Sequence, residues 1–269
     1  MDPNVARSWL FVPATRPERF AKAVASGADM VILDLEDAVP AEEKDAARRA
    51  AATWMVGDGA AAVRVNAADS DHHDDDVAAI AGLPGLRAVL LPMAESVEAI
   101  AGLRERLGPD VALVPQLETA LGLLRAVDLA AAPGVRRLAF GHLDFAVDID
   151  AAPQPQALLH ARSAIVVASR AARVAGPVDS VTTDLDDDEI TRDDATQARA
   201  LGFTGKLCIH PRQVAAVNAA MGPSRDDVAW ARRVLEAGTT GAARVDGQMV
   251  DAPVIARAQR IMSRAGDHR

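Results

Sequence analysis

Cysteine and aromatic residues are scarce in this chain of 269 residues. Cys208 is the single cysteine, which excludes an internal disulfide and any metal site built from several cysteines. Tyrosine is absent, and the aromatic residues together make up 3% of the chain. A chain with one thiol is typical of a reducing compartment.

Long apolar runs are also missing. No uninterrupted apolar stretch reaches the roughly 20 residues that a membrane-spanning helix needs. The first residues, Met1–Arg7, are polar and lead directly into a strand-like segment, a pattern unlike that of a signal peptide. We therefore expect a cytoplasmic protein with no membrane partner.

Basic residues are outnumbered by acidic ones. The chain has 29 Lys and Arg against 38 Asp and Glu, and its net charge is −9. Surfaces that bind nucleic acid or anionic membranes need a clustered basic face, and the sequence has no such cluster, so we expect neither partner. The nucleotide-binding patterns GxGxxG and GxxxxGK[ST] are absent as well.

Short apolar segments alternate with helical patterns along the chain. We expect strands at residues 9–13, 30–35, 61–65, 87–92, 111–117, 135–140, 178–182 and 206–209. We expect the intervening helices at residues 18–26, 42–55, 76–83, 96–107, 120–132, 156–174, 187–201 and 212–221.

Eight strand–helix units in roughly 220 residues predict a TIM (β/α)8 barrel over residues 1–222. An open doubly wound sheet has the same periodicity and stays the alternative, although no nucleotide-binding loop supports it. The pattern then changes, and residues 223–269 predict a short C-terminal helical extension. It consists of helices at 226–237 and 253–265, separated by a Gly/Thr turn at 238–241.

Acidic residues follow two neighbouring predicted strands. The active site of such a barrel lies at the carboxyl ends of its strands, and Glu118 and Asp144 stand at two of these ends. Carboxylates that converge repel one another unless a proton or a cation lies between them. We therefore interpret Glu118 and Asp144 as ligands of a hard divalent ion such as Mg²⁺. The alternative for each is a structural acid that pairs with a lysine or caps the next helix.

Arg64 stands inside the apolar segment AAVRV at residues 61–65. Because arginine is rarely buried without an anionic partner, Arg64 either pairs with an internal acid or binds a substrate carboxylate. Glu36 and Asp37 follow the neighbouring predicted strand and are candidate partners of Arg64.

Other clusters of chemically active residues favour structural interpretations. The acidic runs at residues 69–76 and 184–189 each precede a predicted helix, where carboxylates stabilise the helix N-terminus. Metal binding by His72 and His73 is the alternative for the first run. Cys208 is expected to be a small core residue, and His210 is expected to form a structural hydrogen bond at the barrel mouth.

Six motifs together resemble the citrate lyase beta-subunit-like branch of the HpcH/HpaI aldolase superfamily, nearly from end to end and in the expected order. They are RSWLFVPA (7–14), ADMVILDLEDAV (28–39), AVRVNA (62–67), LVPQLETALGL (113–123), FGHLDF (140–145) and GFTGKLCIHPRQV (202–214).

The resemblance implies a TIM barrel that uses Mg²⁺ to make or break a carbon–carbon bond. The partners would be a 2-keto acid and the acetyl group of a CoA or acyl-carrier thioester. The family pattern places metal-binding acids at Glu118 and Asp144, with Glu118 also facing the substrate, and a substrate-carboxylate arginine at Arg64. Family oligomers are commonly trimers or hexamers, and the segment GQMVDAP (247–253) is similar to one that brings an aspartate, here Asp251, into a neighbouring subunit's site.

The chain departs from this pattern at a few positions. Relatives usually carry Lys where this chain has Met93, and a leucine where it has Phe145. The longer C-terminal lid of the malyl-CoA lyases is missing. These changes bear on the substrate more than on the chemistry.

The expected reaction is Mg²⁺-dependent cleavage or condensation of a thioester such as citryl-, malyl- or citramalyl-CoA. Arg64 would bind the keto acid, Asp251 would transfer the proton of the acetyl carbon, and Glu36 and Asp37 would support Arg64. Two alternatives stay open. One is a class II aldolase that acts on free 2-keto acids, and the other is a non-catalytic subunit that binds a partner.

Overall fold

The computed structural model describes residues 1–237 and 243–266. The chain divides into two compact units, Met1–Asn218 and Ala219–Arg269, and each is described by itself. Among the described residues, no helix combines the length and the apolar character that crossing a membrane requires.

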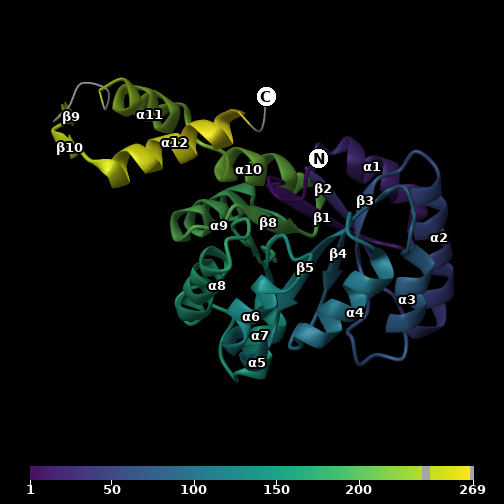
Figure 1. The fold of residues 1–269 in the computed structure, drawn as a ribbon. Helices are drawn as coiled ribbons and strands as arrows, with labels where there is room; N and C mark the ends of the chain where they lie inside the picture. Colours follow the sequence, from purple (N-terminus) through teal and green to yellow (C-terminus); the bar gives the residue numbers. More distant parts are fainter. Residues whose placement is uncertain (238–242, 267–269) are drawn as a thin grey trace. The chain divides into compact units, whose positions relative to one another are not determined.

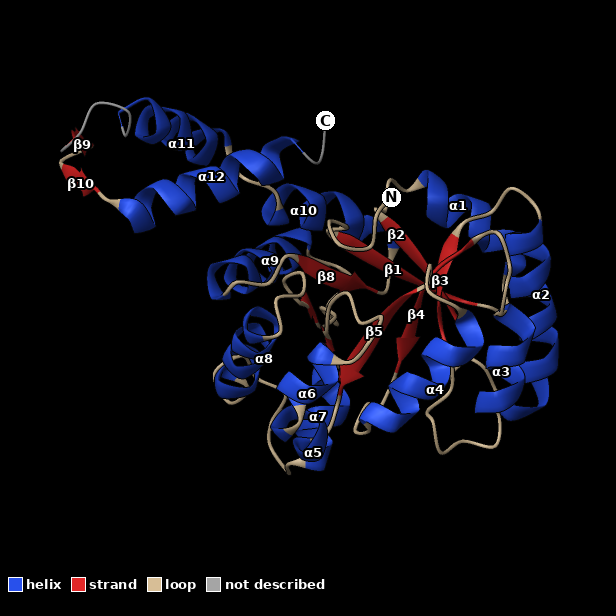
Figure 2. Cartoon of the chain, viewed as in Figure 1, coloured by secondary structure: helices blue, strands red, loops and turns tan. Residues whose placement is uncertain are grey.

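The first unit is built on a closed barrel of parallel strands that pair in sequence order, with the last strand returning to the first. The strands are β1 (Ser8–Pro13), β2 (Met30–Asp34), β3 (Ala61–Arg64), β4 (Leu86–Leu91), β5 (Ala112–Leu117), β6 (Ala139–Phe140), β7 (Val178–Asp179) and β8 (Gly205–Cys208). Helices surround this barrel, as Figures 1 and 2 show. The predicted TIM barrel is therefore confirmed, and the open sheet is excluded.

The helices of the barrel unit follow the strands. They are α1 (Phe20–Ala25), α2 (Lys44–Val56), α3 (His73–Ile80), α4 (Val97–Leu107), α5 (Ala120–Leu124), α6 (Ala126–Ala131), α7 (His142–Asp148), α8 (Leu159–Ala171), α9 (Asp188–Leu201) and α10 (Pro211–Met221), the last of which runs past the unit boundary.

Three elements differ clearly from the sequence-based expectation, and the first is the strand expected at 178–182, which is reduced to Val178–Asp179. The single helix expected at 120–132 is two helices, because the backbone of Arg125 leaves helical geometry at φ −97° and ψ 6°. The strand expected at 135–140 is reduced to Ala139–Phe140, and α7 begins directly after Gly141. Asp144 therefore lies in the first turn of a short helix and not on the strand end itself.

Alternation along the strands explains the barrel interior. Every second residue points inward, so Trp9, Ile32 and Val114 belong to one buried cluster with small residues such as Ala62 and Ala88. Trp9 is the largest side chain of this cluster, and its Nε1 donates to the Ala6 carbonyl at 3.1 Å. One tryptophan among alanines thus packs a core that is otherwise poor in aromatic residues.

The second unit is a helical hairpin closed by a small sheet. It contains α11 (Arg225–Ala237), the antiparallel strands β9 (Ala243–Val245) and β10 (Gln248–Val250), and α12 (Ala252–Gly266). Asp246 and Gly247 join the two strands with φ of 51° and 81°, the left-handed pair that a tight hairpin turn requires. Both expected helices are present, whereas the hairpin was not expected, and the turn expected at 238–241 lies outside the described residues.

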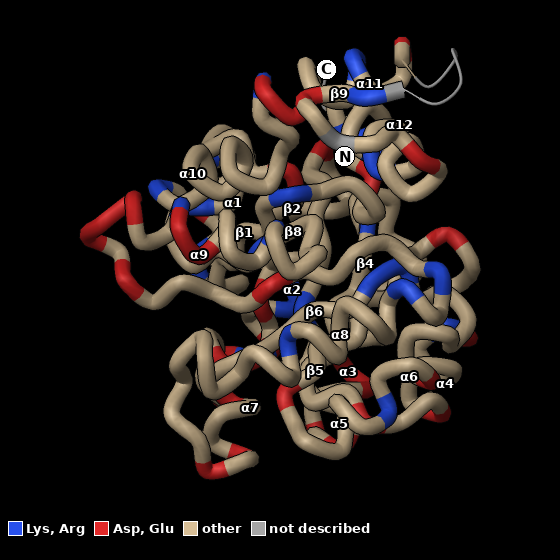
Figure 3. The backbone as a smooth tube through the Cα atoms, turned by 90° about the vertical axis from the view of Figure 1, so that its left-hand side faces the viewer, with Lys and Arg blue, Asp and Glu red and all other residues tan. Residues whose placement is uncertain are grey.

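The acidic runs lie at helix starts, and all but one of the acids in the first turn of α3 are exposed. Asp187 accepts a hydrogen bond from the Glu189 amide at the start of α9, as the helix-terminus interpretation predicts. Asp76 in α3, by contrast, is fully buried and binds Arg48 and Asn66. Figure 3 shows acidic and basic positions interspersed around the barrel, so the net charge of −9 says little about the local charge at any one site.

Candidate functional site

Inward-facing positions become polar at the carboxyl ends of the strands. Asp34 follows Ile32 in the same alternation, Arg64 follows Ala62, and Gln116 and Glu118 follow Val114. These side chains line a cavity of about 390 Å³ together with Asp37 and Asp144. The strand period that builds the apolar core therefore also directs the polar groups into the barrel mouth.

Arg64 is held by carboxylates from β2 and the loop that follows it. Arg64 and Asp34 are direct neighbours in the pairing of β3 with β2, and Nε and Nη2 of Arg64 donate to Asp34 at 2.8 and 2.6 Å. Nη1 lies 2.8 Å from Glu36 Oε2 and 3.4 Å from Asp37 Oδ2. The guanidinium also lies over the Phe11 ring, 4.7 Å from its centre.

Of the two alternatives that the sequence left open for Arg64, the pairing with internal acids is present, and because Arg64 also lines the cavity, its binding of a substrate carboxylate stays a prediction. Burial disfavours the charge on Arg64, but the hydrogen bonds and charge of Asp34 outweigh burial and raise its pKa. The expected association of Glu36 and Asp37 with Arg64 is present. Asp34, which accepts two hydrogen bonds from Arg64, was not among the predicted site residues, although its position two residues after Ile32 in the strand alternation was a usable sequence signal.

Glu118 is buried at the end of β5. Its Oε2 accepts the Met93 amide at 2.9 Å, and its Oε1 accepts Nε2 of Gln116. Burial raises the pKa of Glu118 to about 7, and the charge of Asp144 adds to the rise. Met93 adopts a left-handed backbone with φ of 48°, which is uncommon for a residue with a side chain and aims its amide at this carboxylate.

Asp144 reaches the same cavity from α7. Gly141, just before this helix, passes so close to Glu118 that a Cβ on Gly141 would lie 2.1 Å from Glu118 Oε1. Glycine is therefore needed here for close approach. The His142 amide donates to Ser180 Oγ at 3.0 Å, which fixes the start of α7 against the end of β7. Asp144 itself is exposed on the cavity side of that helix.

The cavity carries more negative than positive groups. Burial raises the pKa of Glu36 to about 8, the charge of Arg64 opposes the rise, and Asp37, Glu118 and Asp34 reinforce it. Carboxyl groups crowded in this way hold protons unless a cation replaces them. Among the described residues, the carboxyl groups of this cavity therefore outnumber the one arginine that lines it, and a cation could balance the excess negative charge.

The donor set fits a magnesium ion held by two carboxylates. Mg²⁺ usually takes one or two protein carboxylates and fills its other positions with water and substrate oxygens. Glu118 and Asp144 would supply two, and Gln116 Oε1 is a buried oxygen with no hydrogen-bond partner in this cavity. Within the described ranges no group of three His, Cys, Asp or Glu side chains has metal-site geometry, so other metal sites, including one at His72 and His73, find no support there.

The remaining predicted residues lie elsewhere. Asp251 is exposed in the second unit, where its Oδ1 accepts the Val254 amide at 3.1 Å and caps α12. Cys208 is buried in β8, and burial raises the pKa of its thiol to about 12. His210 accepts the Arg212 amide at 3.2 Å, the structural role expected for it.

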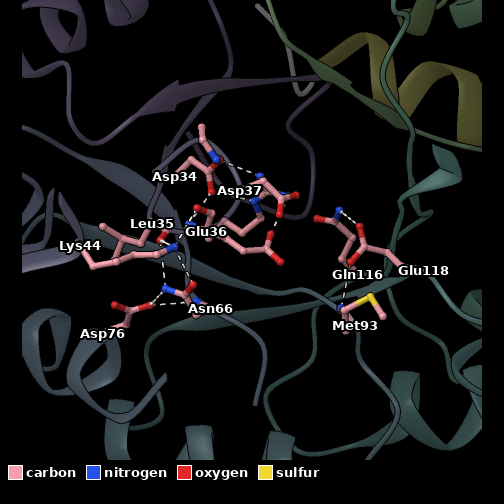
Figure 4. Close-up of polar contacts among 12 residues, drawn as sticks. Asp34, Leu35, Glu36, Asp37, Lys44, Asn66, Asp76, Met93, Gln116 and Glu118 are labelled. Carbon is pink, nitrogen blue, oxygen red and sulfur yellow. Dashed lines mark hydrogen bonds and ion pairs between the residues drawn. The ribbon is translucent and has the colours of Figure 1, made fainter. Parts of the chain in front are cut away.

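Behind the loop that carries Glu36 lies a second polar group that sequence reasoning missed. Lys44, Asn66 and Asp76 form a buried hydrogen-bonded network there, and Figure 4 shows it beside the Gln116, Glu118 and Met93 group. No local sequence signal marks Lys44 for this role, because its partners come from other elements.

Comparison with known proteins identifies relatives along nearly the whole chain. Residues 7–211 match the family model described as HpcH/HpaI aldolase/citrate lyase, and residues 165–268 match a model described as a C–C bond lyase of the TIM-barrel fold. The citrate lyase subunit beta-like protein of Mycobacterium tuberculosis is 40% identical over 269 residues, which cover 96% of this chain and 95% of that protein.

Two solved structures extend the comparison. The protein CitE of Mycobacterium tuberculosis in complex with magnesium, acetoacetate and coenzyme A superimposes with a TM-score of 0.84 at 36% identity, over 98% of this chain and 99% of that one. The citrate lyase beta subunit of the same organism, complexed with oxaloacetate and magnesium, gives a TM-score of 0.73 at 34% identity, over 83% and 100%. This chain belongs to the HpcH/HpaI aldolase/citrate lyase family of carbon–carbon bond lyases.

Proposed function

We propose that the chain is a Mg²⁺-dependent lyase that cleaves a 3-hydroxyacyl thioester with a neighbouring carboxylate into a 2-keto acid and an acetyl thioester, and catalyses the reverse condensation. Citryl-, malyl- and citramalyl-CoA are the candidate substrates. The observation that carries the proposal is the single cavity lined by Glu118, Asp144 and Arg64. Relatives solved with magnesium, oxaloacetate, acetoacetate and coenzyme A support it.

Glu118 and Asp144 would hold the magnesium ion. When bound, Mg²⁺ supplies Lewis acidity that lowers the pKa of the substrate hydroxyl and stabilises the oxygen of the forming keto group. The Met93 amide and Gln116 fix the Glu118 carboxylate, and Gly141 leaves it room. These contacts preorganise one ligand before the substrate enters.

Arg64 would bind the substrate carboxylate through Nη1. Nε and Nη2 donate to Asp34, whereas Nη1 makes a longer hydrogen bond with Asp37 and an ion pair with Glu36 Oε2 at 2.8 Å that lacks hydrogen-bond geometry. Nη1 is therefore the guanidinium nitrogen with donor capacity left for a substrate carboxylate. Asp34 and Glu36 would keep the guanidinium plane fixed while the carbon–carbon bond breaks.

Asp251 would act from a neighbouring subunit of a trimer or hexamer. In cleavage, the substrate hydroxyl would lose its proton to water, and its oxygen electrons would form the keto C=O bond as the carbon–carbon bond breaks. The electron pair of the broken bond would pass to the acetyl thioester as an enolate, and Asp251 in its acid form would give a proton to the enolate carbon. In condensation, the Asp251 carboxylate would remove that proton. Its exposure at the start of α12 leaves it accessible to another copy of the chain.

Asp144→Asn should lower kcat/KM for thioester cleavage by about a thousandfold, because loss of a ligand removes several kcal/mol of electrostatic stabilisation. The assay measures the keto acid released from malyl-, citramalyl- and citryl-CoA. The corresponding free acids are assayed in parallel as alternative substrates. Asp148→Asn on the same helix is the matched control, since Asp148 contacts the Ala120 amide and does not line the cavity. Full activity in Asp144→Asn would exclude the metal assignment, and equal cleavage of the free acids would favour the aldolase alternative.

Magnesium affinity should rise with pH. Glu118 has a pKa of about 7 without the ion and must lose its proton to bind it. Below that pH the dissociation constant for Mg²⁺ should increase about tenfold per pH unit, and above it the constant should level off. Titration calorimetry over about 3 pH units, from roughly pH 5.5 to 8.5, measures the dissociation constant for Mg²⁺. Glu118→Gln is the variant in which the pH dependence of this constant should disappear. An affinity independent of pH in the unsubstituted protein would contradict the role of Glu118.

Mixing two inactive variants should restore activity if Asp251 acts across subunits. Asp144→Asn chains keep Asp251, and Asp251→Asn chains keep both metal ligands, so a site formed between the two kinds of chain can be complete. Random assembly of a ring would make about a quarter of the sites complete. Refolding the variants together and separately, and measuring cleavage, tests this. No recovery in proven mixed oligomers would place the proton donor within one chain.

A further inference from the structure

Lys44, the first residue of α2, is caged by three oxygen atoms. It is 7% exposed, and its Nζ donates to the Leu35 carbonyl at 2.7 Å, to the Glu36 carbonyl at 2.8 Å and to Asn66 Oδ1 at 2.7 Å. An ammonium group has three donors, so all three are used on this cage. Figure 4 shows Lys44 reaching toward Leu35, Glu36 and Asn66.

This position is unfavourable for a lysine on two counts. A cation at a helix N-terminus opposes the helix dipole, and burial costs the ammonium its hydration. Burial lowers the pKa of Lys44, and the charges of Asp76, Asp34, Glu36 and Asp37 oppose that shift. The compensating free energy must therefore come from the hydrogen bonds and from these neighbouring acids.

The cage fixes the peptide unit that carries Glu36. On one side, Asp34 Oδ1 accepts the Glu36 amide at 3.0 Å, and on the other, the Glu36 carbonyl accepts from Lys44. The Leu35 carbonyl is held twice, by Lys44 and by Asn66 Nδ2 at 2.9 Å. With its backbone restrained at both ends, the Glu36 side chain lies 2.8 Å from Arg64 Nη1.

The cage is itself anchored to the barrel unit. Asp76 Oδ2 accepts the Asn66 amide at 2.8 Å and Asn66 Nδ2 at 2.6 Å, and Asp76 Oδ1 accepts Arg48 Nη1 at 2.9 Å. Asn66 follows β3, two residues after Arg64. Lys44 thus ties the loop after β2 to the loop after β3, the two segments that meet at Arg64.

We propose that Lys44 is a positioning residue that sets the orientation of the Arg64 guanidinium through Glu36, and so controls the affinity for the keto acid. The inference deepens the proposed function and rests on it for the identity of the ligand. Lys44 acts from behind the cavity, which it does not line. Its effect should therefore fall on the keto acid and leave the metal ligands unchanged.

The test compares Lys44→Met, which keeps the side-chain length and removes the ammonium, with Arg104→Met. Arg104 also donates to backbone carbonyls, those of Gly108 and Val111, but these lie at the N-terminal end of β5, away from the cavity. Oxaloacetate with Mg²⁺ is the binding probe, measured by calorimetry. Hydrogen exchange of residues 35–39 reports on the loop directly.

Lys44→Met should weaken oxaloacetate binding about tenfold, while the dissociation constant for Mg²⁺ stays the same. In the condensation reaction, the KM for oxaloacetate should rise and kcat should change less than about twofold. Exchange of residues 35–39 should accelerate in this variant alone. Lys44→Arg, which keeps the charge and several donors, should recover most of the affinity. It also keeps the test decisive if Lys44→Met folds poorly.

Oxaloacetate binding and loop exchange in Lys44→Met that match those of Arg104→Met would overturn the inference, as would an unsubstituted protein that does not bind oxaloacetate. Absence of thioester cleavage in an unsubstituted protein that still binds oxaloacetate would contradict the proposed function alone. The two failures are therefore distinguishable.

Discussion

The buried guanidinium of Arg64 is the constraint on which the barrel mouth depends. A charge inside the ring of strands needs partners in the same place, and the register of β3 against β2 puts Asp34 directly beside it. A bidentate arginine–carboxylate pair is strong and directional, and removing one member would leave the other buried and unpaired. The ion pairs of Arg64 with Asp34 and Glu36 therefore also restrain the loops that follow β2 and β3.

The acids recruited around Arg64 outnumber it, and that excess defines the chemistry. Glu118 is buried and Glu36 is half-buried, and desolvation raises their pKa values to about 7 and about 8. Protonated carboxyl groups release their protons when they bind a divalent cation. The cavity is therefore suited to a metal ion that takes some of its ligands from the protein and the others from water and substrate. A protein of net charge −9 can nevertheless bind an anionic substrate, because a bound cation and Arg64 would each offer a positive charge to its oxygens.

Much of the fold and part of the site could be predicted from the sequence, because strand and helix periodicities are local. The alternation that places Ile32 and Val114 in the core also predicts that Asp34 and Glu118 point into the mouth. The position of Asp144 near the site was predicted, but its helix was not, because α7 follows a strand of only two residues.

Contacts between distant elements could not be predicted in this way. Lys44 and Asn66 meet through tertiary packing, and Asp76 is buried where an acidic run suggested a solvated helix start. The hairpin before Asp251 was missed, although its Asp-Gly pair is a recognised turn signal. Whether Asp251 serves another subunit depends on assembly, which the pattern of a single chain does not contain, and it stays a prediction.

The most direct test of the account is a crystal structure with Mn²⁺ in place of Mg²⁺ and with oxaloacetate, since the anomalous signal of manganese locates the ion independently of its coordination. The account predicts one strong anomalous peak bound by the carboxylates of Glu118 and Asp144, with the oxaloacetate carboxylate on Arg64 Nη1. A peak bound by other residues, or carboxylates of Glu118 and Asp144 that point apart in the presence of the ion, would contradict it.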